Sequence, residues 1–205
     1  MSGDVTDAAG ALTLAGVGCA TISLGVLHVA PTGLSWARNA VSQYGISRHS
    51  AGYRVLTVSM GVAAAALAVG LTAAFGSAFG AVVTLLAVLS AARLAISWFP
   101  MDEPGGASTS TGRTHVVLAV VTFGSAVLAA LRLGAALNRA GSWPDVSAAS
   151  TALGWCLAAA AAGMIAGRRV EGLRSCFGAI ERFFYAGVLG WLALVGTALL
   201  VTGHS

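Results

Sequence analysis

Six long apolar runs take up most of this chain and leave little room for any soluble domain. They cover about residues 10–30, 53–75, 77–99, 114–137, 148–167 and 182–202. A helix needs about 20 apolar residues to cross the hydrocarbon core of a bilayer. Only 9% of the residues are charged, against about 25% in soluble domains. The sequence therefore predicts an all-α fold, a polytopic integral membrane bundle of six transmembrane helices that forms a single domain over residues 1–205.

Two kinds of local signal set the limits of these helices. The second and third runs are nearly continuous, and the Gly-Ser break in FGSAFG, residues 75–80, predicts a tight hairpin between them. Pro100 ends the third helix because the residue before a proline is pushed out of the α region. The first run follows Asp4 and Asp7 with no basic residue. Since that is the wrong flank for a cleaved signal peptide, we expect the first helix to be retained.

Small residues are frequent in the apolar runs. Alanine fills most of residues 63–68 and 157–163, and Gly76 and Gly80 have GxxxG spacing. Such residues suit close helix packing in lipid and make a homo-oligomer possible. An alanine-rich composition without special meaning explains them equally well.

The arginines bear on the orientation in the membrane. All eleven basic residues are arginine. Those at or near the first, third and fifth connectors are Arg38, Arg48, Arg54, Arg113, Arg168, Arg169, Arg174 and Arg182, whereas the other side has Arg132 and Arg139. The positive-inside rule then places these odd connectors in the cytoplasm and both termini outside. The scatter of the arginines between apolar runs argues against a nucleic-acid partner.

The first connector, residues 31–52, is long for a turn within a bundle. Helical spacing relates the apolar residues Leu34, Ala37, Val41 and Tyr44, and polar residues fall elsewhere on the wheel. This pattern is typical of a short interfacial helix whose apolar stripe lies in the headgroup layer. The alternative is a cap over a binding cavity.

The third connector, residues 100–113, lies on the same predicted side and contains most of the polar groups that could carry chemistry. Asp102 and Glu103 are adjacent, so on a helix they would point about 100° apart and would not easily act as a pair. The run STSTG, residues 108–112, supplies candidate N-caps for the fourth helix. A solvated, capped loop is the alternative to a site.

His115 begins the fourth helix, and His28 lies near the end of the first. With Asp102 or Glu103 these histidines could form a mixed zinc site. No HExxH motif and no pair of histidines four residues apart requires one. We therefore expect no metal and no cofactor, and keep His28, His115 and Asp102 as the alternative metal set.

Arg93 lies inside the third apolar run, where a charge is expensive and usually marks function or a partner. An ion pair or a headgroup contact would explain it. Snorkelling toward the headgroups and a catalytic role are the alternatives.

The motifs SQYG in the first connector, FPMD after the third helix, the histidine that opens the fourth helix and the final ERFFYAGVLGW together resemble the bacterial membrane-protein family called domain of unknown function 998. The resemblance covers nearly the whole chain. It implies six membrane helices, no assigned activity and a relation to the DRAM-like superfamily, which includes proteins linked to lipid-anchor remodelling. That superfamily is drawn with its first connector outside the cytoplasm, opposite to the arginine count.

We expect a multi-pass protein of the bacterial plasma membrane that binds membrane lipids or a partner through a polar face made by connectors 31–52 and 100–113. The candidate ligand-binding residues are Arg93, Asp102, Glu103, Arg113 and Tyr44. No acid lies in the middle of an apolar run, which argues against a proton-coupled carrier, and no GxSxG motif indicates a hydrolase. A membrane enzyme acting on a lipid headgroup or an isoprenoid, with Asp102 and His115 as catalytic groups, is the alternative.

Overall fold

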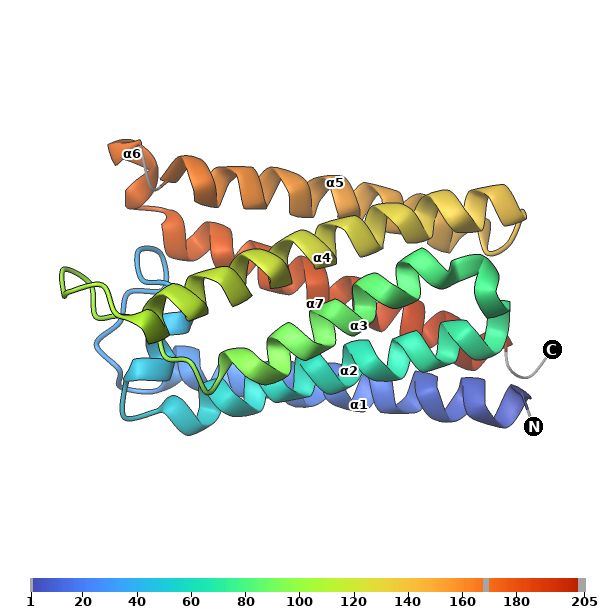
Figure 1. Ribbon diagram of the computed structural model, residues 1–205, viewed down its shortest axis with the longest axis horizontal. Coiled ribbons are helices and arrows are strands. Elements are labelled where there is room, and N and C mark those ends of the chain that lie inside the picture. The colour runs from blue at the N-terminus through green and yellow to red at the C-terminus, as the bar shows by residue number, and fades with distance from the viewer. Residues whose placement is uncertain (1, 168–169, 203–205) are drawn as a thin grey trace.

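The computed structural model describes residues 2–167 and 170–202 as an all-helical bundle without strands in those ranges (Figure 1). Its elements are α1 (Ser2–Val29), η1 (Val41–Ile46), α2 (Ser50–Phe75), η2 (Gly76–Phe79), α3 (Gly80–Ile96), α4 (Ser110–Ala140), α5 (Pro144–Gly167), α6 (Glu171–Arg174) and α7 (Phe177–Thr202). The η elements are short 3-10 helices. The all-α prediction is confirmed.

Within the described residues, five helical segments are long and apolar enough to cross a membrane. Four are α1, α4, α5 and α7, and the fifth is Ser50–Ile96, a stretch of 47 residues that contains α2, η2 and α3. The chain reverses direction at η2, so that α2 and α3 pack side by side (Figure 1). These apolar helices indicate a multi-pass membrane protein.

The two ends of the bundle differ in what they carry. The first connector, here residues 30–49, and the third connector, residues 97–109, lie at one end together with α6 (Figure 1). The other end carries η2, the turn between α4 and α5, and both ends of the chain (Figure 1). We call the end that carries the first and third connectors and α6 the connector end. Arg168 and Arg169, which entered the arginine count, lie outside the described residues.

Several helices are longer than the apolar runs that predicted them. α1 begins at Ser2 and so includes Asp4 and Asp7, and α4 begins at Ser110. The Thr109 hydroxyl caps α4 by accepting a hydrogen bond from the Gly112 amide at 3.0 Å. Hydropathy marks only the apolar part of a helix, whereas capping and helix propensity extend it into polar sequence.

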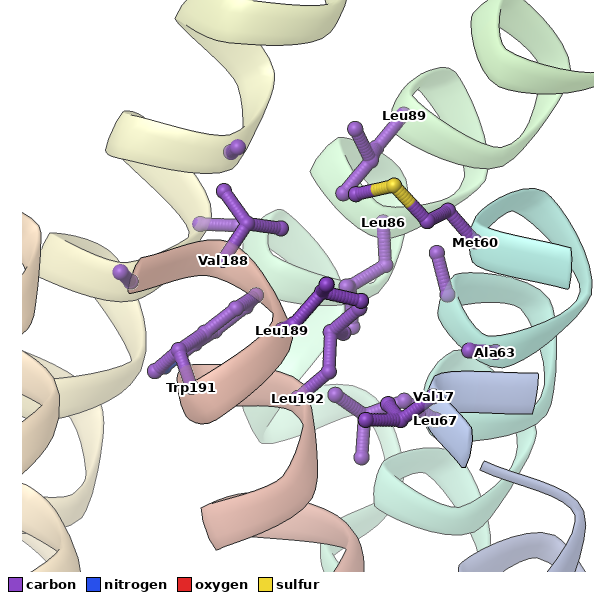
Figure 2. Packing of buried hydrophobic residues seen from close by; sticks show 14 of the residues in the cluster. Val17, Met60, Ala63, Leu67, Leu86, Leu89, Val188, Leu189, Trp191 and Leu192 are labelled. Carbon is purple, nitrogen blue, oxygen red and sulfur yellow. The ribbon is translucent and has the colours of Figure 1, made fainter. Parts of the chain in front are cut away.

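The core is shared by the long helices, and α7 contributes to it by packing against α1, α2 and α5. Figure 2 shows Leu189 and Leu192 of α7 pointing toward residues of α1, α2 and α3, whereas Val188 and Trp191 lie on the other side of α7. Trp191 is fully buried, and its indole N–H donates to the Ser150 hydroxyl of α5 at 2.8 Å. The polar edge of the largest core side chain is thereby satisfied.

Glycines let some helices approach closely, but they are not the pair that the sequence indicated. A Cβ on Gly16 of α1 would lie 2.8 Å from the Ser59 carbonyl oxygen of α2. At Gly76 and Gly80 an added Cβ would meet no described atom within 4 Å. Gly76 has a φ of 62° and forms the turn into η2, so the prediction that this pair packs helices together is wrong within the bundle.

The interfacial helix predicted in the first connector is also wrong. The connector contains the 3-10 helix η1 instead, and Val41 and Tyr44, two members of the expected apolar stripe, are 0% and 1% exposed. Both side chains belong to the hydrophobic core rather than to an outer surface. The connector therefore covers the end of the bundle, as in the cap alternative.

Candidate functional site

A cavity of about 490 Å³ lies at the connector end and contains most of the polar groups in question. The connectors contribute Arg38, Ser42, Gln43 and Asp102 to its lining, and the helices contribute Tyr53, Arg93, His115, Glu181 and Tyr185. The two connectors also touch, because the Ser42 hydroxyl donates to the Met101 sulfur at 3.2 Å. The polar face predicted from the two connectors is therefore a lined cavity.

Arg93 is held in the wall of this cavity by one aromatic side chain. Its Nη1 donates to the Tyr185 hydroxyl at 2.9 Å, and its guanidinium carbon lies 4.6 Å from the centre of the Tyr185 ring. The side chain is 1% exposed, which rules out snorkelling to the outer surface. Its Nε and Nη2 are buried and have no hydrogen-bond partner among the described residues.

The two unpaired atoms are a chemically meaningful pair. Nε and Nη2 of an arginine form one edge of the planar guanidinium, and this edge donates two parallel hydrogen bonds to a carboxylate or a phosphate. Burying a cation without such partners is costly. Arg93 therefore presents an unfilled anion fork in the wall of the cavity.

His115 is fixed by a backbone carbonyl at the start of the third connector. Its Nδ1 lies 2.7 Å from the Phe99 carbonyl oxygen, which can only accept, so Nδ1 carries a proton. The other ring nitrogen, Nε2, has no hydrogen-bond partner in the described part of the chain, and His115 lines the cavity. The ring is thus oriented by the backbone and keeps one nitrogen for a ligand.

Asp102 stands at the junction of the third connector and α4. Its two carboxylate oxygens accept from the Thr109 hydroxyl at 2.6 Å and from the Thr109 amide at 3.1 Å. These hydrogen bonds lower the pKa of the Asp102 carboxyl below its usual 3.8. A Cβ on Gly112 would overlap the carboxylate, so only glycine leaves room for it. Asp102 is therefore an ionised group that also supports the cap of α4.

Two adjacent residues of α7 hold the first connector in place. The Glu181 carboxylate accepts from the Val41 amide at 2.7 Å. Arg182 donates from Nη1 to the Asn39 carbonyl at 2.8 Å and from Nη2 to the Tyr44 hydroxyl at 3.1 Å. Both side chains are less than a tenth exposed. They fix the connector over the cavity.

Arg182 also forms a hydrogen bond with His28. Arg182 Nε donates to His28 Nε2 at 2.6 Å, and His28 Nδ1 lies 2.7 Å from the Leu24 carbonyl oxygen. Both ring nitrogens of His28 are thus engaged within the protein. In the described ranges no three His, Cys, Asp or Glu side chains are grouped so that they could hold a metal ion.

The structure brings together only some of the residues selected from the sequence. Arg93, Asp102 and His115 line the cavity. Glu103 is exposed outside it, and Arg113 is exposed beside a smaller depression. Tyr44 is buried behind the cavity against Arg182.

Three polar residues that the helices contribute to the cavity, Tyr53, Tyr185 and Glu181, were not among the predicted site residues. Glu181 and Tyr185 are four residues apart, so they share one face of α7. Two polar residues at this spacing in an apolar helix were the available signal. No comparable signal exists for Tyr53, because a tyrosine near a helix start is ordinary at a membrane interface.

A second depression, of about 690 Å³, lies between α4 and α5. Its lining is mostly small or apolar, with no charged side chain among the described residues that form it. The described residues of this depression therefore provide no charged side chain that could pair with an ionic group. The cavity at the connector end is therefore the candidate site.

Of the comparisons with known proteins, the one with family profiles gave a match. Searches of curated proteins and of solved structures each returned no match. Residues 9–198 match the sequence profile of the family described as Protein of unknown function (DUF998). That match covers nearly the whole chain and agrees with the resemblance carried by SQYG, FPMD and ERFFYAGVLGW. The chain therefore belongs to the DUF998 family.

Proposed function

We propose that this protein crosses the membrane six times and binds a membrane lipid through its headgroup in the cavity at the connector end. The number of crossings is supported by the reversal at η2 and by the position of both chain ends opposite the connectors (Figure 1). α3, with 17 residues, is about 26 Å long at about 1.5 Å per residue, close to the thickness of the hydrocarbon core.

The unfilled edge of Arg93 is the observation that carries lipid binding. A phosphate group would accept from both Nε and Nη2 and would compensate a buried charge that the protein leaves unmatched. Val116 lines the same cavity and is 40% exposed on the outside of α4. A headgroup in the cavity could therefore remain attached to chains in the bilayer.

The experiment is a lipid titration of the purified protein in detergent, read by native mass spectrometry and by the shift in unfolding temperature. Arg93→Lys keeps the charge but loses the fork, and we expect it to weaken phospholipid binding about tenfold, or 1.4 kcal/mol. Arg54→Lys is the matched control, since Arg54 is exposed at the same end of the bundle and does not line the cavity. Equal lipid binding by all three proteins would refute the proposal.

A second candidate function is favoured by His115. A cavity-facing histidine whose other nitrogen is fixed by a carbonyl is suited to proton transfer, so the protein could be an enzyme that acts on a lipid headgroup or an isoprenoid. Asp102 would serve there as an ionised acceptor. The test compares lipid extracts from a deletion strain complemented with wild type, Asp102→Asn or His115→Ala. An unchanged lipid profile in all three would count against catalysis.

We also infer that the protein lies in the bacterial plasma membrane with its connector end in the cytoplasm. Arg38, Arg48, Arg54, Arg113, Arg174 and Arg182 lie at that end, and Arg132 and Arg139 lie toward the other. Positive residues are retained on the cytoplasmic side during insertion.

A further inference from the structure

The charged groups of the cavity are arranged in order of depth. Asp102 contacts Gly112 in the first turn of α4, at the mouth of the cavity. His115 lies beside the Phe99 carbonyl, at the start of the third connector. Arg93 comes six residues before Phe99 in the chain, inside α3, and therefore lies deeper. Along the wall made by the third connector, α3 and α4, the order from the mouth inward is therefore an acid, a histidine and then a cation.

Beyond Arg93 the lining becomes apolar. The partner of Arg93 is Tyr185, and the neighbouring Phe184 packs against Phe123 with ring centres 4.8 Å apart. Phe123 lies eight residues past His115 on α4, about 12 Å deeper at about 1.5 Å per residue. Ala119, between them, lines the cavity with Phe123. The inner end of the cavity therefore suits hydrocarbon.

Charge in the cavity is balanced rather than purely positive. Arg38 and Arg93 line it, but so do Asp102 and Glu181. A headgroup with only negative charge would meet two carboxylates, which costs binding energy unless they are neutralised. The Asp102 carboxylate accepts two hydrogen bonds, both from Thr109, and a carboxylate has about four acceptor positions. It can still accept from a cation at the mouth.

We propose that the lipid is a zwitterionic phospholipid with a primary amine, placed with its phosphate on the Nε and Nη2 edge of Arg93 and its ammonium at Asp102. The order of a phospholipid from chain to headgroup is hydrocarbon, phosphate and amine. The order of the cavity from inside to mouth is apolar wall, arginine and carboxylate. The order of groups in the lipid therefore matches the order of groups in the cavity, with hydrocarbon at the apolar wall, phosphate at the arginine and amine at the carboxylate. This inference rests on the proposed lipid-binding function.

The test measures binding of phosphatidylethanolamine and phosphatidylglycerol, with identical acyl chains, to the purified full chain in detergent. Wild type should prefer phosphatidylethanolamine by up to about fivefold, since Asp102 is open to solvent and an exposed ion pair contributes little. Asp102→Asn should remove this preference by weakening phosphatidylethanolamine alone. Arg93→Lys should weaken both lipids about equally.

Because Asp102 also supports the cap of α4, Thr109→Val is the control for folding. This variant loses the capping hydroxyl and keeps the carboxylate, so it should retain the preference for phosphatidylethanolamine. Loss of the preference in Thr109→Val as well would assign the effect to the cap and overturn the role of the carboxylate. Glycerophosphoethanolamine, which lacks acyl chains, should bind at least about tenfold more weakly. Equal binding of glycerophosphoethanolamine and phosphatidylethanolamine would assign the site to a soluble phosphoamine and refute the proposal that the ligand is a lipid.

Two failures can be told apart. If wild type binds phosphatidylglycerol as tightly as phosphatidylethanolamine while Arg93→Lys weakens both, the zwitterionic ligand is refuted and headgroup binding at Arg93 stands. If Arg93→Lys weakens neither lipid, the proposed function itself is refuted.

Discussion

Arg93 makes a single hydrogen bond to the described protein although it is 1% exposed, and that is a poor arrangement for stability alone. Removing a guanidinium from water costs several kcal/mol unless its donors are matched. The stacking on Tyr185 offsets part of this cost, since a desolvated cation–π contact contributes about 2 kcal/mol. The remaining cost is understandable if a ligand supplies the missing acceptors.

Arg93→Met tests this trade-off. Methionine fills similar space without a charge, and adding Tyr185→Phe removes the buried hydroxyl that would lose its donor, so in lipid-free detergent we expect the double variant to be at least as stable as wild type. Phospholipid binding should be lost at the same time. Reversible unfolding followed by circular dichroism, with and without added lipid, measures both. A double variant that is less stable than wild type in the absence of lipid would show that Arg93 is mainly structural.

Gly112 is a second residue whose role rests on one contact. In Gly112→Ala the new methyl group would displace the Asp102 carboxylate and disturb the cap at Thr109, which we expect to cost about 1–2 kcal/mol of unfolding free energy. Gly124 lies in the same helix, and an added Cβ there meets no described atom within 4 Å. Gly124→Ala should therefore be neutral or stabilising by up to about 1 kcal/mol. Equal unfolding temperatures for the two variants would contradict this account.

At the scale of elements, the junction of the third connector and α4 should respond to acid. The Thr109 hydrogen bonds favour the ionised form of Asp102 and lower its pKa in the folded state below 3.8. Their contribution to stability is therefore fully present above 3.8 and is lost as the pH falls through the lowered value. The unfolding temperature of wild type should contain an acid-dependent part below pH 3.8 that is absent in Asp102→Asn. Parallel pH profiles for the two proteins would contradict the assignment.

The elements also show what the sequence could and could not predict. The helices were predictable because hydropathy and Pro100 act locally. The first connector was not, because Val41 and Tyr44 are buried by contacts with α7, more than 130 residues further along the chain. A helical wheel registers the apolar stripe but does not tell whether lipid or protein covers it. The site was predictable in part, since Arg93 and Asp102 are unusual for their surroundings and Tyr53 is not.

At the scale of the whole molecule, the inferred orientation can be tested with the native cysteines. Cys19 and Cys156 are exposed on the outsides of α1 and α5, where lipid would cover them, and Cys176 is exposed at the connector end. In a Cys19→Ala, Cys156→Ala background, a membrane-impermeant maleimide should label Cys176 only after cells are permeabilised. Ser142→Cys, in the turn at the opposite end with Cys176 also replaced by Ala, should be labelled in intact cells. The reverse pattern would place the connectors outside.

The central position of α7 has a consequence for biogenesis. α7 supplies Trp191, Leu192 and Val195 to the core, and its Glu181 and Arg182 hold the first connector over the cavity. This helix leaves the ribosome after the other helices of the bundle have been made. The earlier helices already pack on one another, but until α7 inserts the cavity lacks both the partner of Arg93 and the anchor of its cover. A nascent chain is therefore unable to take up its ligand early, and binding competence becomes a mark of completed assembly.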